Sequence, residues 1–320
     1  SFALKPTNKF GKIKQQFGWI EKHVRKTLAL KAINKPAIKK RKYKVVVDAI
    51  NGAGCGALPL LLTKLGVKVI KINCRPNGNF VHEPEPIPKN LQQLGEAVIK
   101  SKADFGLACD PDADRLALVD EKGIPLGEEL TLAIAVREVL RAKKGPVVIN
   151  LSTSKITGDE ALKAGCPLYL SKVGESNVVQ LMQEKRAVIG GEGNGGVIYP
   201  EFHSGRDALV AAAFVLSALA RQSQKMSQFA ETFNKYYTIK AKAAIGPDFI
   251  ERLKQFEVDA KTFVPSPSFN NIDGLRVDFS EGWVLIRSSN TEPIFRVMIE
   301  TIKQSLSENL SKQVMEYFSE

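Results

Sequence analysis

Long apolar runs are missing from this sequence of 320 residues. A membrane-spanning helix needs about 18 or more consecutive apolar residues. The longest apolar candidate, residues 208–220, has the length of a helix buried in a globular core, and Asp207 stands at its N-cap position. No secretory signal peptide is recognisable near Ser1. The sequence therefore predicts no membrane partner.

Cysteine is scarce, and its spacing excludes common metal and redox motifs. The four cysteines, Cys55, Cys74, Cys109 and Cys166, form no CxxC pair and no zinc spacing. We expect reduced thiols in the core of a cytoplasmic protein. The glycine-rich stretch 51–56 also lacks the GxGxxG spacing and the lysine of a Walker motif. A tight strand-to-helix turn is favoured there over a phosphate cradle.

Acidic residues are nearly absent from the first 44 positions, where 14 Lys or Arg stand against one acid. The net charge of +12 comes almost wholly from this segment. A basic arm can bind nucleic acid or another anionic surface. The segment carries no RNA- or DNA-binding signature, so a solvated linker helix around residues 19–30 is favoured and a nucleic-acid partner is not expected.

The remaining chain, in a sequence that is 44% apolar, alternates between strand and helix patterns. Two successive strand–helix–strand units are predicted, each typical of an α/β domain: 45–47, 58–65 and 67–72, then 147–150, 157–163 and 168–171. From about residue 238 the pattern changes. Three strands at 274–279, 283–287 and 295–300 predict an antiparallel meander, closed by a helix at 305–318.

An acidic loop lies between two apolar runs, residues 105–109 and 116–119. Asp110, Asp112 and Asp114 alternate within it, and their carboxylates repel one another unless a cation neutralises them. Carboxylate oxygens are ligands that Mg²⁺ prefers. The alternative of a solvated acidic turn stays open.

A calcium loop of the EF-hand kind would use the same three aspartates together with Glu121. We reject it, because Arg115 occupies the position that requires glycine and both flanks resemble strands.

A second loop, residues 190–196, has five glycines in seven positions. So much backbone freedom costs ordering entropy, and a close approach to a ligand would explain it. Glu192 and Asn194 offer acceptors and donors to hydroxyl groups. An ordinary hairpin turn is the alternative, and this stretch alone does not exclude it.

A third polar loop runs from Arg287 to Arg296. Fork-shaped cations and neutral donors together are typical of a phosphate clamp; the candidates are Arg287, Ser289, Asn290, Thr291 and Arg296. A polar hairpin tip is less favoured, because both arginines fall inside apolar strands, where a buried arginine needs an anionic partner.

These three loops, in this order, resemble those of the α-D-phosphohexomutase family, which includes phosphoglucomutase, phosphomannomutase and phosphoglucosamine mutase. The resemblance runs from about Trp19 to the C-terminus. It implies two related three-layer α/β domains with mixed sheets plus a C-terminal α+β domain with an antiparallel sheet. The implied division is the tail of a first domain and a linker helix over 1–43, α/β domains over 44–124 and 125–238, and a phosphate-binding domain over 239–320.

The resemblance also implies roles for individual residues. Asp110, Asp112 and Asp114 match the family's Mg²⁺ ligands, and Arg115 matches the arginine beside them. Glu192 and Asn194 match residues that hold sugar hydroxyls. The third loop matches the one that grips the substrate's non-reacting phosphate, through Arg287, Ser289, Asn290, Thr291 and Arg296.

The implied function is interconversion of hexose 6-phosphate and hexose 1-phosphate by an intramolecular phosphotransferase, through a phosphoserine and a bisphosphate intermediate. The family's Ser-His-Asn-Pro-type loop and catalytic lysine do not occur in these residues, so we expect this chain alone to be inactive. A homodimer is compatible with this assignment. The alternative is a non-catalytic sugar-phosphate-binding protein whose basic arm recruits a partner.

Two positions weaken the assignment of a particular hexose phosphate. Many family members close the sugar loop with a histidine where this chain has Gly196. Another common histidine, after Val173-Gly174, is replaced by Glu175.

Overall fold

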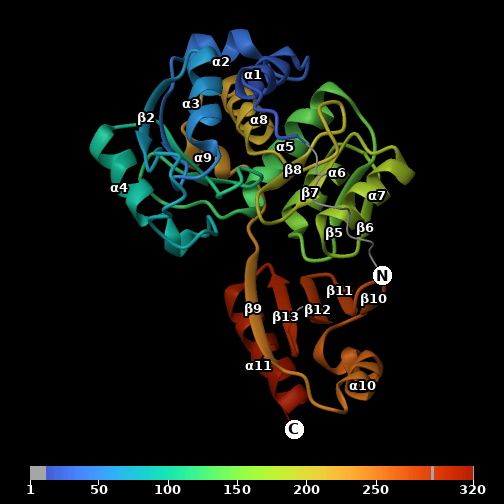
Figure 1. Cartoon of the computed structure of the whole chain (residues 1–320). Coiled ribbons are helices and arrows are strands. Elements are labelled where there is room, and N and C mark those ends of the chain that lie inside the picture. The colour runs from blue at the N-terminus through green and yellow to red at the C-terminus, as the bar shows by residue number, and fades with distance from the viewer. Residues whose placement is uncertain (1–11, 290–291, 320) are drawn as a thin grey trace.

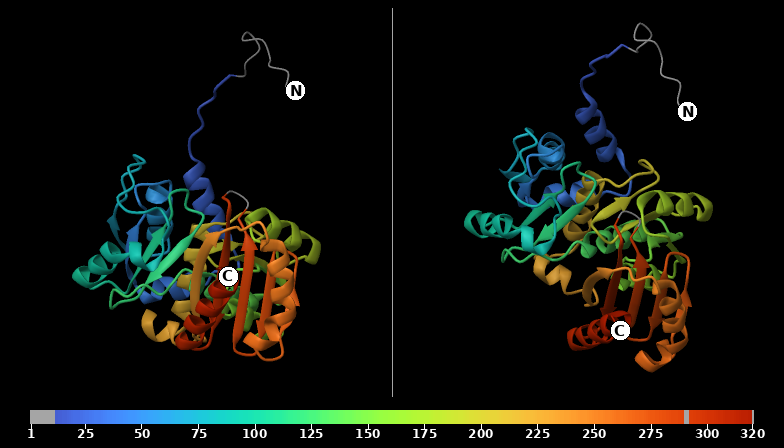
Figure 2. Two further views of the ribbon diagram at one scale, coloured as in Figure 1. Left: turned by 90° about the horizontal axis from the view of Figure 1, so that it is seen from below. Right: turned by 60° about the horizontal axis from the view of Figure 1, so that its bottom comes forward.

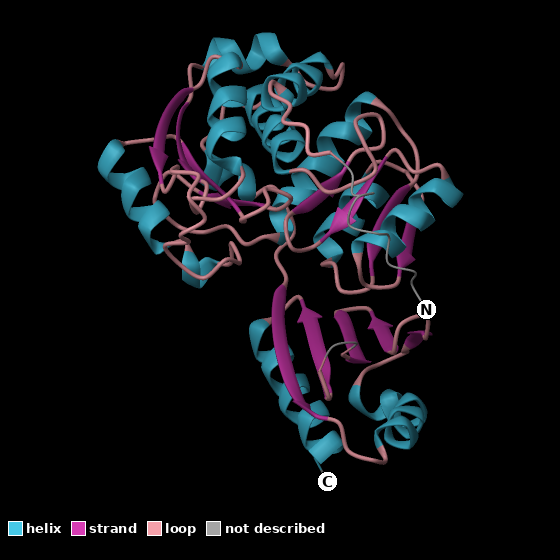
Figure 3. Ribbon diagram, in the orientation of Figure 1, coloured by secondary structure: helices cyan, strands magenta, loops and turns pink. Residues whose placement is uncertain are grey.

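Three β-sheets organise the fold, and each belongs to a different part of the chain (Figure 1). The structure is a computed structural model and describes residues 12–289 and 292–319. Two α/β units lie side by side, and a smaller C-terminal unit hangs below them in Figure 1. Figure 3 shows helices packed against all three sheets.

The first α/β unit has a four-stranded sheet in the order β2-β1-β3-β4. Strands β2 and β3 run parallel to β1, whereas β4 is antiparallel to β3. The strands are β1 Lys44–Asp48, β2 Lys68–Ile72, β3 Phe105–Cys109 and β4 Leu116–Val119. The helices are α3 Gly54–Lys64 and α4 Gln92–Ser101, with a short 3-10 helix, η2, at Pro88–Asn90.

The second unit repeats this topology, with a sheet in the order β6-β5-β7-β8. Again two strands run parallel to the first strand and the last is antiparallel. The strands are β5 Val147–Asn150, β6 Leu168–Ser171, β7 Ile189–Glu192 and β8 Gly196–Ile198. The helices are α5 Glu129–Ala142, α6 Lys155–Lys163, α7 Glu175–Lys185, α8 Ala208–Arg221 and α9 Met226–Ala230.

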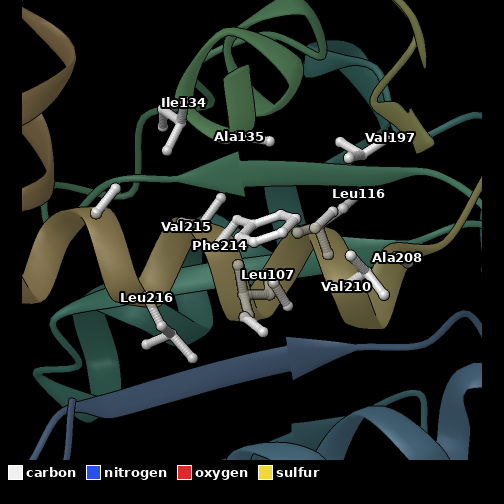
Figure 4. Packing of buried hydrophobic residues seen from close by; sticks show 14 of the residues in the cluster. Leu107, Leu116, Ile134, Ala135, Val197, Ala208, Val210, Phe214, Val215 and Leu216 are labelled. Atoms are coloured by element: carbon white, nitrogen blue, oxygen red, sulfur yellow. The ribbon is translucent and has the colours of Figure 1, made fainter. Parts of the chain in front are cut away.

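Helix α8 joins the two α/β units into one core. Asp207 caps its start, as predicted, by accepting hydrogen bonds from the backbone N–H groups of Leu209 and Val210. The helix is apolar on nearly every face, which is typical of a buried helix. Figure 4 shows Phe214 and its neighbours packed between Leu107 and Leu116 of the first unit and Val197 of the second.

Two N-terminal helices, α1 Trp19–Ala29 and α2 Lys35–Arg41, pack against α8 and complete this core. The predicted linker helix at residues 19–30 is therefore present. It buries Val24 and Thr27 and leaves most of its basic side chains exposed.

The C-terminal unit is a five-stranded antiparallel sheet in the order β10-β11-β12-β13-β9. The predicted meander corresponds to its three central strands, and the structure adds one strand at each edge. The strands are β9 Tyr237–Ala244, β10 Ser268–Asn270, β11 Leu275–Phe279, β12 Gly282–Ser288 and β13 Ile294–Thr301. Helices α10 Phe249–Phe263 and α11 Gln304–Ser319 contact this sheet, and a separate core forms around Phe256 and Phe295.

A small apolar contact joins this unit to the second α/β unit. Trp283 and Leu285, both fully buried, pack against Leu151 at the end of β5. Trp283 also donates from Nε1 to Glu300, whose carboxylate accepts a hydrogen bond from the backbone N–H of Lys155 at 2.8 Å. Figure 2 shows the C-terminal unit against the lower side of the two α/β units.

The predicted fold class is confirmed: two α/β sheets of mixed direction and an antiparallel C-terminal sheet. All four cysteines are free thiols, and three of them, Cys55, Cys109 and Cys166, are buried. No helix within residues 12–289 and 292–319 combines the length and apolarity needed to cross a membrane.

Candidate functional site

The acidic loop is the turn between β3 and β4. Ala113 adopts a left-handed backbone conformation with φ of 61°, which is uncommon for a residue with a Cβ. The backbone N–H groups of Asp114 and Arg115 both donate to Oδ1 of Asp110 at 3.1 Å. One oxygen from each of the three aspartates lies within 4.8 Å of the others. The turn thus gathers the three carboxylates that the sequence singled out.

Asp110 is the most enclosed of them, with only 2% of its surface exposed. Burial raises its pKa to about 7, and the nearby charges of Asp114 and Asp112 add to that rise, although a backbone hydrogen bond from Arg115 opposes it. The Nε of Arg115 lies 3.0 Å from Oδ2 of Asp110. A bound cation would stabilise the ionised carboxylate of Asp110 and so oppose this rise in its pKa.

The donor set fits a hard divalent cation. Asp112 is exposed, and Oδ1 of Asp114 is buried without a hydrogen-bond partner among the described residues. A buried oxygen of this kind needs a partner, and Mg²⁺ takes carboxylate oxygens together with water. The three aspartates therefore form a candidate metal site. The rejected calcium loop gains no support, because Glu121 instead accepts hydrogen bonds from the N–H and hydroxyl of Ser227.

The glycine turn after β1 packs against the acidic loop. The backbone N–H of Ala53 donates to the carbonyl of Pro111 at 2.7 Å. A Cβ on Gly52 would collide with the backbone of Pro111. The glycines therefore serve the close packing of two turns, and helix α3 follows directly at Gly54, as the favoured interpretation predicted.

The glycine-rich loop is the turn between β7 and β8, the same topological position that the acidic loop occupies in the first unit. Glu192 ends β7 and is 6% exposed. Its Oε1 accepts hydrogen bonds from Nδ2 of Asn150 at 2.7 Å and from the N–H of Gly174 at 3.1 Å. Asn194 uses its Oδ1 to accept from the N–H of Gly196 at 3.2 Å. The carboxylate is thus fixed by surrounding donors.

The acidic and glycine-rich loops lie side by side. The N–H of Leu116 donates to the carbonyl of Gly195 at 3.1 Å, and Arg115 forms an isolated β-bridge with Gly196. The start of α8 adds a further link, because Ala208 donates to the carbonyl of Ala113 at 3.0 Å. The repeated topology therefore brings the candidate cation ligands next to the candidate sugar ligands.

Arg206 connects these two loops and was missed by the sequence analysis. Its Nη2 donates to Oδ2 of Asp114, and its Nη1 donates to Oε2 of Glu192 at 2.7 Å. Its Nε lies 3.4 Å from Oε2 of Glu175. Burial alone would lower the pKa of Arg206, but the carboxylates of Asp114, Glu192 and Glu175 raise it, so the guanidinium stays charged. In the sequence, its neighbour Asp207 drew attention only as a helix cap.

The arginine hairpin joins β12 and β13, in which Arg287 and Arg296 are direct cross-strand partners. Arg287 is 15% exposed, with its Nε 3.6 Å from Oδ2 of Asp273. The expectation that both arginines are buried is wrong for Arg296, which is 45% exposed and pairs with Glu292 at 2.9 Å. Both arginines lie on the sheet face that carries Trp283, opposite the face packed against the core of the C-terminal unit.

The remaining clamp residues are only partly described. Ser289 closes the start of the turn, because its N–H donates to the carbonyl of Ile294 at 2.8 Å. Asn290 and Thr291 lie outside the described residues.

A single series of contacts connects the three loops. Asp273, beside Arg287, accepts a hydrogen bond from the N–H of Val173 at 2.9 Å. The next residue, Gly174, donates to Glu192, which binds Arg206, and Arg206 binds Asp114. Arginine, glutamate and aspartate side chains from three domains thus share one connected region.

The architecture defines a class of multidomain α/β protein in which an acidic turn, a glycine-rich turn and an arginine hairpin meet. Three family models match consecutive segments: the phosphoglucomutase/phosphomannomutase alpha/beta/alpha domain II over residues 21–123, domain III over 127–236, and the C-terminal domain over 238–316. The chain belongs to this phosphohexomutase family, as the resemblance indicated.

Individual relatives agree with that assignment. A phosphoglucomutase/phosphomannomutase of Thermococcus kodakarensis is 38% identical over 269 residues, which cover 82% of this chain and 58% of that protein. A probable phosphoglucosamine mutase of Thermococcus gammatolerans is 32% identical, covering 99% of this chain and 68% of the relative. The chain thus spans a little over half to two thirds of these relatives.

Solved structures show the same fold. A phosphoglucomutase/phosphomannomutase family protein from Burkholderia thailandensis superimposes with a TM-score of 0.82 at 25% identity. The match covers 95% of this chain and 64% of that one.

Proposed function

We propose that this chain supplies the metal-, sugar- and phosphate-binding parts of a phosphohexomutase that interconverts hexose 6-phosphate and hexose 1-phosphate. The observation that carries the proposal is the connected series of contacts from Arg287 through Asp273, Glu192 and Arg206 to Asp114. A hexose phosphate has an anionic end and a ring of hydroxyls. The series offers the arginine side chains of the hairpin for the anionic end, the fixed carboxylate of Glu192 for the hydroxyls, and the acidic loop as a site for a metal cation.

Charge supports a divalent cation at the acidic end. Five carboxylates gather there, on Asp110, Asp112, Asp114, Glu175 and Glu192, with two guanidinium groups, on Arg115 and Arg206, among them. When bound by the three aspartates, Mg²⁺ would offset the charge on the phosphoryl group being transferred.

The arginine hairpin would hold the phosphate that is not being transferred. Arg287 and Arg296 provide fork-shaped donors suited to phosphate oxygens, and Ser289 adds a neutral donor. Glu192, held by Asn150 and Gly174, would accept a hydroxyl of the sugar through the remaining lone pair of Oε2.

The phosphoryl donor is a phosphoserine from outside these 320 residues, since no Ser-His-Asn-Pro-type loop occurs in them. Its phosphoryl group would pass to a free hydroxyl of the bound hexose phosphate and give a hexose bisphosphate. After the sugar turns round, the phosphoryl group at the other end would return to the serine. Each half-reaction breaks one P–O bond and forms another.

A non-catalytic sugar-phosphate-binding protein is the second candidate, favoured by that same missing serine loop. It would use the clamp and Glu192 in the same way, without transfer. The two proposals separate on turnover once a serine-loop domain is supplied, and they agree on binding.

Binding of a hexose-phosphate panel tests both. Calorimetric titration would compare the 6-phosphates of glucose, mannose and glucosamine with the free sugars, in the presence of Mg²⁺. At least one phosphate should bind more than about tenfold more tightly than its free sugar, because charge-assisted hydrogen bonds to phosphate are worth roughly 1.5–3 kcal/mol each. Equal binding of phosphates and free sugars would contradict the proposal.

A further inference from the structure

Arg206 binds two carboxylates that the proposed function assigns to different ligands. One terminal nitrogen contacts Asp114 of the acidic loop, and the other contacts Glu192 of the glycine-rich loop. The side chain is 15% exposed and lines a pocket together with Asp112 and Asp114. One rigid, planar group therefore links the two carboxylates. A change in the charge of either carboxylate alters the interaction of the guanidinium with the other.

The two oxygens of Asp114 are divided between different environments. Oδ2 accepts from Arg206, whereas Oδ1 is buried, 3.6 Å from Nε of Arg115, and has no hydrogen-bond partner among the described residues. A cation held by the acidic loop can bind Oδ1 while Arg206 remains near Oδ2. Cation and guanidinium then compete for the charge of one carboxylate.

The same division applies at Glu192. Oε1 already accepts two hydrogen bonds, from Asn150 and Gly174, and Oε2 accepts one from Arg206. A carboxylate oxygen has two lone pairs, so a sugar hydroxyl that reaches Glu192 binds Oε2 and lies next to Nη1 of Arg206.

Two nearby residues, Gly196 and Glu175, allow Arg206 to take this position. A Cβ on Gly196 would collide with Cδ of Arg206. Glu175 accepts a hydrogen bond from the backbone N–H of Arg206 at 2.8 Å. Gly196 and Glu175 thus both act on the position of Arg206. The glycine leaves the path of the side chain open, and the glutamate anchors its backbone.

We propose that Arg206 is a positioning residue that couples cation binding at the acidic loop to sugar binding at Glu192; the inference rests on the proposed function. Without a cation, the guanidinium neutralises Asp114 and Glu192 together. A divalent cation on Asp114 weakens the attraction of that carboxylate for the guanidinium. Arg206 then interacts more strongly with Glu192 and the sugar hydroxyl, and by reciprocity a bound sugar increases the affinity for the cation.

Calorimetry on the full chain tests this coupling, with Mn²⁺ as the metal and whichever of glucose, mannose or glucosamine 6-phosphate binds best. In the wild type, saturating Mn²⁺ should raise hexose-phosphate affinity by about fivefold to tenfold. In Arg206→Gln the coupling should fall below about twofold, and Mn²⁺ without sugar should bind severalfold more tightly, because a competing positive charge is gone. Loss of a merely structural residue would weaken both ligands.

Two further variants separate charge from bridging. Arg206→Lys keeps the positive charge but not the planar fork, so its Mn²⁺ affinity should stay near that of the wild type while the coupling is lost. Arg137→Gln is the matched control: Arg137 binds Glu160 in a similar ion pair at 2.6 Å, away from the site, and this variant should retain both affinities and their coupling. If Arg206→Gln does not fold, as judged by thermal unfolding, Arg206→Lys carries the test.

Wild-type coupling in Arg206→Lys or Arg206→Gln would overturn the inference, as would a parallel loss of both affinities. If the wild type binds Mn²⁺ but no hexose phosphate, the proposed function fails. In that case the Mn²⁺ affinity of Arg206→Gln still decides whether Arg206 competes for Asp114: tighter binding supports the competition, and equal or weaker binding refutes it.

Discussion

Arg287 and Arg296 face each other directly across strands β12 and β13. Like charges placed opposite in an antiparallel pair destabilise a sheet. Here Asp273 lies 3.6 Å from Arg287 and the exposed Glu292 pairs with Arg296, so each charge has one carboxylate partner. An anionic ligand between the two arginines would relieve their repulsion further. This arrangement supports the proposal that the hairpin binds a phosphate.

Truncation of the more exposed arginine tests this clamp. Arg296→Ala should weaken hexose-phosphate binding by about tenfold to a hundredfold and leave binding of the free sugar unchanged. Mg²⁺ affinity should also stay constant, since the acidic loop belongs to the first α/β unit. The control is Arg252→Ala, because Arg252 lies in the same domain but pairs with Asp248 on α10. Calorimetry that finds wild-type affinity in Arg296→Ala would make the turn an ordinary hairpin tip.

Asp112 allows a clean test of the cation site. Across the described part of the chain it makes no hydrogen bond or ion pair, and it is exposed, so Asp112→Asn should not disturb the fold. Mg²⁺ or Mn²⁺ should bind about tenfold more weakly, because one of three anionic ligands is lost. Glu96→Gln removes an exposed carboxylate elsewhere in the same unit and serves as control. Equal cation affinity in Asp112→Asn and wild type would refute the site.

An assay of turnover tests whether this chain alone catalyses the reaction or only binds the ligands. A coupled assay of glucose 1-phosphate conversion should give background rates with the 320-residue chain, even with a bisphosphate primer, because no Ser-His-Asn-Pro-type loop occurs in it. Turnover that follows the purified protein and disappears in Asp112→Asn would show that the nucleophile lies within these residues.

The cap of helix α8 predicts a pH-dependent contribution to stability. Burial would raise the pKa of Asp207, but hydrogen bonds from His203 and His23 and from the backbone lower it from an ordinary value of 3.8 to about 2. A lowered carboxyl pKa stabilises the folded state above the unfolded-state pKa, and this contribution is lost as pH falls from 3.8 towards 2. Asp207→Asn keeps the helix cap but removes the charge.

We therefore expect Asp207→Asn to lower the free energy of unfolding by about 2 kcal/mol at pH 7. The difference from wild type should shrink towards zero near the lower end of that pH range. Urea titrations at pH 7, 5, 3 and 2 measure both quantities. A difference that does not change with pH would mean that the cap acts through hydrogen bonding alone.

Much of the fold could be predicted from the sequence because its elements are strongly patterned. The strands at 147–150 and 168–171 and the cap at Asp207 are found where predicted. Helix α7 and strand β9 were not predicted. Strand β9 is an edge strand with exposed alternate residues and lysines at 240 and 242, so its stability comes from pairing with β13 rather than from an apolar pattern.

The three loops could be predicted because their chemistry is local, whereas their connection could not. Arg206 lies 92 positions from Asp114 in sequence, and their contact depends on the way in which α8 joins the two α/β units. The exposure of Arg296 was also not predictable: it shares a sheet face with Arg287, and the covering of that face depends on packing between domains rather than on the strand pattern. A side chain that connects two domains belongs to no periodic sequence pattern, so the sequence alone does not reveal its contacts.

We propose that one site accepts a hexose phosphate in both orientations, as interconversion by a mutase requires. Competition calorimetry would titrate glucose 1-phosphate into the chain with Mg²⁺ present, alone and after saturation with glucose 6-phosphate, and would repeat this with the mannose and glucosamine pairs. For at least one sugar, the two phosphates should exclude each other and bind within about tenfold of one another, both depending on Arg296. Simultaneous binding of both isomers, or binding of one isomer only for every sugar, would contradict the account.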